Sequence, residues 1–279
     1  MIIKFPKKIV VYLAIFTCFS SVISARDITL KEIINTASDD FKYLVASPLR
    51  MTQKDGLKLL ALSGLSAGLI FHFDQEIEDN LIENHRFKSP VLHSFSNIAK
   101  TYGASDHAVI YMFSGLSSSI LAGGYLFNDN KMWDTGFLMV ESFVYSQFIT
   151  WFGKLALGRA RPYAQKGSHD FNFFAFSVDD RSYRSMPSGH TTAVFALMTV
   201  LAKQYEQWWI KYPAYTFATA AAIQRVDSGH HWASDVLLGG CIAYFVADIL
   251  VDNHKLKKTS QTSLKPYILS NEMGLSLYF

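Results

Sequence analysis

The sequence predicts an all-α protein, a bundle of helices that forms one domain. Half of its 279 residues are hydrophobic and only 18% are charged, a composition that provides for a large core and excludes a disordered chain. Apolar runs follow one another along most of the chain, and they are too long or too rich in Ala, Leu and Gly to form a set of strands. Because no repeat, Gly/Ser linker or Pro-rich tract separates these runs, we expect a single helical domain over residues 26–258.

The segment 1–25 has the pattern of a secretory signal. Lysines at positions 4, 7 and 8 precede an apolar stretch, and small residues end the segment at Ser24 and Ala25. The alternative is an uncleaved first membrane helix, and either structure directs the chain out of the cytosol. Without these three lysines the 26 basic residues become 23, equal to the 23 acidic residues, so the charge balance implies no nucleic-acid partner.

The expected helices correspond to the apolar runs in chain order. These runs cover residues 57–73, 107–127, 136–152, 191–202, 215–223 and 236–251. Only the second run provides close to the ~20 uncharged residues that a membrane span requires, so the number of spans stays open. The tail 259–279 alternates at Leu275, Leu277 and Phe279, and we expect a small hairpin on the bundle surface rather than the closing strand of a barrel.

The first stretch with chemical character is KLALGRARP, which runs from Lys154 to Pro162. Lys154 and Arg161 are seven residues apart, close to two helical turns, so we expect both cations on one helix face. Pro162 disfavours helical geometry at Arg161 and so predicts that the helix ends there. Arg159 lies off that face, and we expect its charge to be solvated. Taken alone, a solvated basic helix end explains this stretch best.

The second stretch is SMPSGHTT, immediately before an apolar run. Pro187 and Ser188 favour a helix start, where free backbone N–H groups make a site for an anion. Gly189 lets the backbone approach a ligand closely, and His190 beside it has a pKa suited to proton transfer at neutral pH. A simple helix N-cap explains the stretch equally well when it is considered alone.

The third stretch is QRVDSGHHWASD, at the entrance to the last apolar run. His231 and Asp235 are four residues apart, so in a helix the carboxylate accepts the proton of one ring nitrogen and leaves the other as a nucleophile. His230 is five residues from Asp235 and lies on the wrong face for that bond. The alternative is that both histidines cap a helix.

Together the three stretches form a set, Lys-x6-Arg-Pro, then Pro-Ser-Gly-His, then Arg-x5-His-x3-Asp. In this order the set resembles the type 2 phosphatidic acid phosphatase superfamily, which includes bacterial acid phosphatases and vanadium haloperoxidases. The resemblance covers residues 154–235. It departs from the family at Gln224, where the family usually has Ser before the arginine. It implies a six-helix bundle core, membrane-embedded, with the active site at one end of the bundle.

The resemblance also implies a role for each motif residue. His231 is expected to attack phosphorus and form a phosphohistidine, while Asp235 holds the tautomer of its ring. His190 is expected to protonate the leaving group and later to activate water. The residues expected to bind the substrate phosphate are Lys154, Arg161, Ser188, Gly189 and Arg225. Because fixed cations can replace a metal ion, we expect no cofactor and no metal ligands.

The expected activity is therefore metal-independent hydrolysis of a phosphomonoester or diphosphate, with a phosphorylated lipid or a small phosphomonoester as substrate. A vanadium haloperoxidase and a soluble periplasmic acid phosphatase are the alternatives. The connection 163–184 is either a lid that admits an acyl tail or a loop that packs on the bundle. Its aromatic residues are Phe171, Phe173, Phe174 and Phe176.

The expected location is the cell envelope, either in the inner membrane with a periplasm-facing site or wholly in the periplasm. If every apolar run crossed the membrane, Lys154 would lie on the cytosolic side. An outward-facing site therefore requires that one run does not cross, and the run 57–73 is the weakest, because it is short and carries Lys58 near its start.

Overall fold

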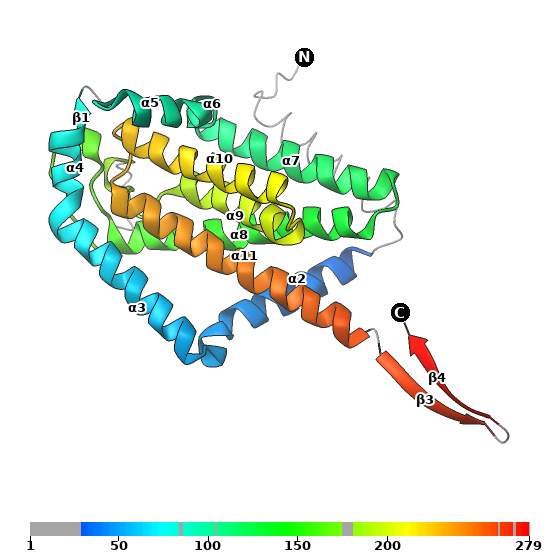
Figure 1. Cartoon of the computed structure of the whole chain (residues 1–279). Helices are drawn as coiled ribbons and strands as arrows, with labels where there is room; N and C mark the ends of the chain where they lie inside the picture. Colours follow the sequence, from blue (N-terminus) through cyan, green and yellow to red (C-terminus); the bar gives the residue numbers. More distant parts are fainter. Residues whose placement is uncertain are drawn as a thin grey trace, which may run out of the picture.

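The computed structural model describes residues 29–83, 86–103, 105–174, 181–261, 263–269 and 272–278. The predicted signal segment 1–25 and Phe176 lie outside these ranges. Helices make up most of the described chain, and the prediction of an all-α bundle is confirmed (Figure 1).

The elements follow one another in two groups. The first group contains α2 (Leu30–Val45), α3 (Gln53–Gly68), α4 (Asp74–Leu81), β1 (Ile82–Glu83), β2 (Arg86–Phe87), α5 (Pro90–Ser96), α6 (Lys100–Gly103) and α7 (Asp106–Leu126). The second group contains α8 (Asn130–Leu157), α9 (Gly189–Gln204), α10 (Trp208–Asp227), α11 (Ala233–Gln261), β3 (Ser263–Leu269) and β4 (Glu272–Tyr278). Short 3₁₀ turns lie at Ser47–Arg50, Asn97–Ala99, Pro162–Ala164 and Arg181–Tyr183.

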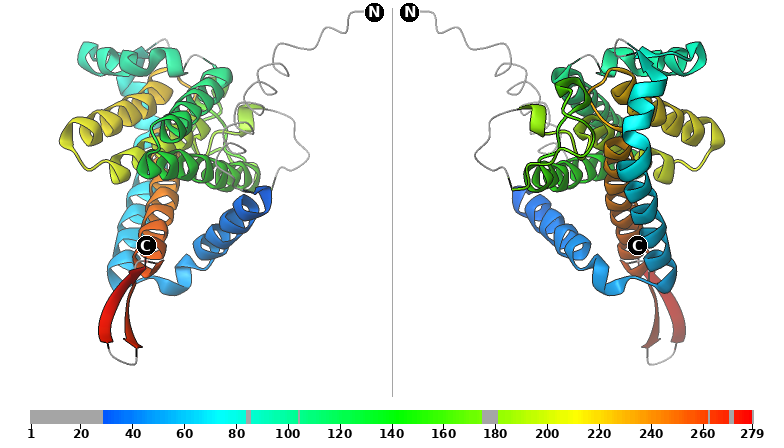
Figure 2. Two further views of the ribbon diagram at one scale, coloured as in Figure 1. Left: turned by 90° about the vertical axis from the view of Figure 1, so that its right-hand side faces the viewer. Right: turned by 90° about the vertical axis from the view of Figure 1, so that its left-hand side faces the viewer.

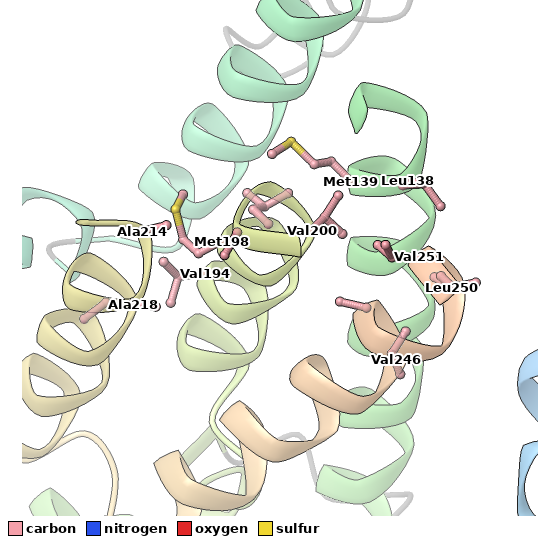
Figure 3. Close-up of a cluster of buried hydrophobic side chains, with 14 of the residues drawn as sticks. Leu138, Met139, Val194, Met198, Val200, Ala214, Ala218, Val246, Leu250 and Val251 are labelled. Atoms are coloured by element: carbon pink, nitrogen blue, oxygen red, sulfur yellow. The ribbon is translucent and has the colours of Figure 1, made fainter. Parts of the chain in front are cut away.

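Helix α9 is the centre of the bundle. It packs against α8, α10 and α11, and its buried side chains meet those of all three neighbours (Figure 3). Val194, Leu197 and Val200 are fully buried on α9. A helix that is apolar on every side is stable only when every side is covered, which explains the continuous apolar run in this part of the sequence.

Helices α3 and α4 form a strut beside the bundle. A π-helical turn at Leu69–Phe73 joins them, so that the chain is helical from Gln53 to Leu81. The strut rises from the end of α2 to the end of the bundle where α9 and α11 begin (Figures 1 and 2). Its upper end contacts α11.

Within the residues that the structure describes, three helical segments are long and apolar enough to cross a membrane, judged by length and composition. They are Gln53–Leu81, His107–Leu126 and Ala233–Lys258. The sequence analysis treated the run 57–73 as too short to cross, and this is wrong about its length. The helix continues through the π-helical turn, and the segment reaches 29 residues.

The C-terminal tail forms the predicted hairpin. Strands β3 and β4 pair antiparallel, with Leu264 opposite Leu277 and Pro266 opposite Leu275. The hairpin points away from the end of α11 and does not lie on the bundle surface (Figures 1 and 2). Helix α11 ends at Gln261, three residues beyond the predicted boundary.

The close approach of α11 to the start of α9 generates a prediction. A Cβ atom at Gly239 would lie 2.7 Å from the carbonyl oxygen of Ser188 and 3.0 Å from Oγ1 of Thr192. Gly239→Ala should therefore push the two helices apart and lower the free energy of unfolding by about 1–3 kcal/mol. Gly240→Ala is the matched control, since its nearest neighbour is the Phe195 ring at 3.5 Å, an ordinary contact. Equal melting temperatures for the two variants would contradict this packing.

Candidate active site

The three motif stretches converge at one end of the bundle. Helices α8 and α10 finish there, and α9 and α11 begin there (Figure 1). Lys154 lies in the last turn of α8, Ser188 precedes α9, Arg225 lies near the end of α10, and His231 precedes α11. The antiparallel packing of successive helices thus brings together residues that are far apart in the sequence.

The first stretch leaves the helix earlier than expected. Helix α8 ends at Leu157, because Gly158 adopts a left-handed conformation with φ +54°. Arg161 lies beyond it in extended backbone, as the following proline predicts. The prediction that Lys154 and Arg161 share a helix face is therefore wrong. Both side chains nevertheless reach the same carbonyl oxygen, that of Arg184, at 2.7 and 3.3 Å.

The second stretch begins α9 as predicted, with Ser188 at the N-cap. The N–H of Ser188 donates to the carbonyl oxygen of Asp235 at 3.0 Å, which ties the start of α9 to α11. Gly189 faces Lys154, since a Cβ atom on it would lie 3.7 Å from Cε of that lysine. His190 is 8% exposed, and its Nε2 atom lies 3.4 Å from the carbonyl oxygen of Ser105.

In the third stretch, Ser185 lies between the two residues expected to bond. Helix α11 begins only at Ala233, so His231 precedes it and helical spacing does not apply. Nδ1 of His231 lies 3.7 Å from Oδ2 of Asp235, beyond hydrogen-bond distance. The Ser185 hydroxyl donates to that carboxylate oxygen and lies 3.5 Å from Nδ1. The N–H of Trp232 donates to the same oxygen at 2.9 Å.

Arg159 is fully buried, so the prediction of a solvated charge is wrong. That prediction assumed a helix through this residue, whereas the chain is extended after Gly158. Nη1 of Arg159 donates to Oδ1 of Asp235 at 2.9 Å, and Nη2 donates to Oδ2 of Asp74 at 2.8 Å. The guanidinium also donates from Nε to the carbonyl oxygen of Ser168 at 2.9 Å.

Basic side chains line a cavity of about 660 Å³ at this end of the bundle. They are Lys154, Arg161, Arg181, Arg184 and Arg225, with His107, His190 and His230 beside them. So many cations around one hollow favour an anionic ligand. The sequence analysis did not identify Arg181, Arg184 or His107 as site residues. A signal existed for the two arginines, because they closely precede the second stretch in the chain and therefore lie near the same end of the bundle.

His230 and His231 differ in exposure. His230 lines the cavity, and its Nδ1 atom lies 2.9 Å from the carbonyl oxygen of Ser228. His231 is only 2% exposed, and burial lowers the pKa of its imidazole well below the ordinary value of 6.5. The nearby charges of Lys154, Arg161, Arg225 and His190 lower this pKa further. The ring is therefore neutral at neutral pH and keeps a lone pair for attack.

A polar cluster holds α5 and α6 against the end of α10. Nη1 of Arg225 donates to the carbonyl oxygen of Gly103 at 2.6 Å. Two residues further along α10, Asp227 accepts from the N–H of Phe87 at 2.6 Å and lies 2.9 Å from Nδ1 of His93. His93 had no assigned role in the sequence analysis, and here it positions the segment that covers Arg225.

Gln224, the departure from the family pattern, lies against Gly103. It is 9% exposed. A Cβ atom at Gly103 would lie 1.8 Å from Oε1 of Gln224, so the glutamine occupies the space that a side chain would need. The long side chain is accommodated because its neighbour is a glycine.

The aromatic residues of the connection 163–184 differ in how they pack, so neither predicted role, a lid or a loop packed on the bundle, describes all of them. The rings of Phe171 and Phe173 stack with centroids 5.3 Å apart, and the Phe171 ring lies 5.3 Å from the guanidinium carbon of Arg159. Phe173 and Phe174 are 59% and 66% exposed. The loop therefore packs on the bundle at one ring and presents two others to the surroundings.

Comparison with known proteins identifies one family. The family model described as the PAP2 superfamily matches residues 135–257. A lipid A 1-phosphatase of Porphyromonas gingivalis is 30% identical over 133 residues, which are 43% of this chain and 30% of that protein. A lipid A 1-phosphatase of Rhizobium etli is 31% identical over 106 residues, 37% of this chain and 44% of that protein. The chain thus spans less than half the length of either relative.

Two solved structures are similar in outline. The crystal structure of Aquifex aeolicus LpxE has a TM-score of 0.46 at 20% identity, covering 65% of this chain and 96% of that chain. A PAP2 type phosphatidylglycerolphosphate phosphatase from Bacillus subtilis has a TM-score of 0.43 at 18% identity, covering 79% of this chain and 96% of that chain.

The segment that matches the family model contains all three motif stretches, and its helices α8 to α11 bring those stretches to one cavity. The helical segment 135–257, which carries most of the cavity lining, is therefore the part of this chain that is similar to the PAP2 superfamily.

Proposed function

We propose that this protein is a phosphoric ester hydrolase that removes a phosphate group from a phosphorylated lipid through a phosphohistidine at His231. The observation that carries the proposal is the arrangement of a neutral, buried imidazole next to a cavity lined by five basic side chains. An anionic phosphate held by those cations would lie within reach of a nucleophile that needs no deprotonation at neutral pH.

In the first step, the substrate phosphate binds between Lys154, Arg161 and Arg225, with the Ser188 hydroxyl and the Gly189 N–H as further donors. Nε2 of His231 forms a bond to phosphorus, and the bond from phosphorus to the lipid oxygen breaks. The Ser185 hydroxyl accepts a hydrogen bond from the Nδ1–H group of the ring and donates one to Asp235, and no proton is transferred, so the positive charge that develops on the imidazole faces a carboxylate.

His190 completes both steps. As an acid it gives a proton to the departing lipid oxygen, and as a base it takes a proton from the water that attacks phosphorus. The bond between phosphorus and Nε2 then breaks, which releases inorganic phosphate and restores the neutral imidazole of His231. Because three cations neutralise the phosphate oxygens, the proposed mechanism needs no metal ion or other cofactor.

A lipid is the proposed substrate for two reasons. In the described part of the chain, three helical segments are long and apolar enough to place the bundle in a membrane. The two relatives described above are named lipid A 1-phosphatases, and the family model matches the part of this chain that carries the site. A phosphate group on lipid A or on a similar membrane lipid is therefore the substrate class that we propose.

We also propose that the site faces the periplasm from the inner membrane. This orientation rests on the secretory pattern of segment 1–25, and it requires that Gln53–Leu81, although long and apolar enough to cross, lie at the membrane without completing a crossing.

A phosphate-release assay tests the proposed function. Purified protein should release phosphate from lipid A or phosphatidate in detergent, and EDTA should leave the rate unchanged, because the proposed site uses basic side chains in place of a metal. Orthovanadate should inhibit as a transition-state mimic.

Release from p-nitrophenyl phosphate alone would support the soluble acid phosphatase. Halide oxidation activated by vanadate would support the haloperoxidase, and loss of activity in EDTA would exclude the metal-free mechanism.

The two adjacent histidines provide a sharper test. His231→Ala should abolish the acid-labile phosphoenzyme and lower turnover by several orders of magnitude, as loss of a covalent nucleophile does. His230→Ala is the matched control and should keep the intermediate and most of the rate, because this ring bonds to Ser228. Labelled phosphate on His230, or near-normal turnover in His231→Ala, would reverse the assignment.

The pKa of His231 sets the acid limit of activity. kcat/KM reports the protonation of the free enzyme. Since the pKa of the ring is held well below 6.5, the nucleophile stays neutral as the pH falls through that value. kcat/KM should therefore keep its plateau at pH 6.5 and decline only in more acidic solution. Circular dichroism over the same range separates this decline from unfolding. A loss of kcat/KM on acidification that is centred above pH 6.5 would contradict a buried neutral imidazole.

A further inference from the structure

We propose that Asp74, on helix α4, is a positioning residue of the active site that acts through Arg159 on the carboxylate behind His231. The inference rests on the proposed function. It adds a residue from outside the segment that matches the family model, because Asp74 precedes residue 135 by a long stretch of chain.

Asp74 is bonded to two parts of the site, the first turn of α11 and the guanidinium of Arg159. The residue is 1% exposed, and both of its carboxylate oxygens have partners. Oδ1 accepts from the backbone N–H of Ser234 at 3.0 Å, while Oδ2 accepts from the Ser234 hydroxyl and from Nη2 of Arg159 at 2.8 Å. Ser234 is adjacent to Asp235 in the first turn of α11. Asp74 therefore fixes that turn directly and also through the guanidinium.

The charges in this chain of residues favour more than a structural role. Asp74 and Asp235 are both buried and share one guanidinium, that of Arg159, so two acidic groups lie beside a single cation. Burying a group of this kind costs more free energy than burying apolar side chains of the same size. If this position only had to be filled, an apolar side chain would do so at a lower cost in free energy than the carboxylate of Asp74. A site in which a neutral imidazole becomes cationic is stabilised by it.

The strut carries Asp74 to this position. Asp74 is the first residue of α4 and follows the π-helical turn, and the next residue is also fixed, since Gln75 accepts from the N–H of Ser168 at 3.0 Å. Ser168 in turn accepts from Arg159 at its carbonyl oxygen. The upper end of the strut and the loop after α8 thus both bond to the guanidinium and to each other.

Asp74→Asn tests the inference, because it removes the charge while an amide oxygen can still accept from Ser234 or Arg159. We expect kcat for phosphate release to fall about 10–100-fold with little change in KM. The acid limb of kcat/KM should move to lower pH, because loss of a negative charge disfavours the protonated ring of His231. The other groups that face this ring stay in place in the variant. They are Lys154 and Arg161, His190 on α9, Arg225 on α10, and Asp235 on α11.

Glu76→Gln is the matched control. Glu76 lies on the same helix and is exposed, so this variant removes an equal charge without touching the buried chain. It should retain the wild-type kcat and acid limb. The inference is overturned if Asp74→Asn behaves like Glu76→Gln, or if it lowers only the melting temperature while kcat per folded molecule and the acid limb stay unchanged.

A second comparison covers the case in which Asp74→Asn does not fold. If Asp74 acts through Arg159, the double variant Asp74→Asn/Arg159→Gln should be at least as active as Arg159→Gln alone, because the double variant leaves one buried carboxylate in place of two. Independent, multiplied losses would overturn the inference. A wild-type protein that forms no phosphoenzyme overturns the proposed function together with this inference, whereas a wild-type phosphoenzyme with unaffected variants overturns the inference alone.

Discussion

The buried guanidinium of Arg159 is the interaction on which the rest of the active-site end depends. It joins the strut at Asp74, the first turn of α11 at Asp235, and the loop after α8 at Ser168. Every one of these contacts lies out of solvent, and a buried ion pair that loses one partner costs ~3–5 kcal/mol. The three segments therefore cannot separate independently, and the position of His231 follows from theirs.

His231 stands between two regions of opposite charge. The cavity residues Lys154, Arg161 and Arg225 lie close enough to lower the pKa of its ring, and the carboxylate of Asp235 lies behind Ser185. This arrangement suits a reaction in which a dianionic phosphate enters and the imidazole becomes cationic. The cations lower the pKa of the ring. In the mechanism that we propose, they would also hold the ligand, and the carboxylates would stabilise the charge that forms on the ring during the reaction.

Local sequence patterns predicted the helices and the start of α9, because Pro187 and Ser188 before an apolar run determine where a helix begins. They also selected the residues that meet at one end of the bundle, while the catalytic roles of those residues stay predictions. The prediction that the charge of Arg159 is solvated was wrong, because it applied helical spacing to residues beyond Gly158, where the helix has ended. Asp74 could not have been found, because it lies 85 residues before Arg159 in a stretch without a motif, and only the folded chain brings the two together.

The fit between Gly103 and Gln224 has a consequence for how this sequence can change. With the Gln224 side chain in its present conformation, a Cβ atom at 103 would overlap its amide oxygen. A shorter residue at 224 would open that space, after which a larger residue at 103 could be accepted. The two positions are therefore coupled: a side chain at 103 requires a new rotamer or a shorter residue at 224, and it also alters the backbone at the glycine whose carbonyl oxygen holds Arg225.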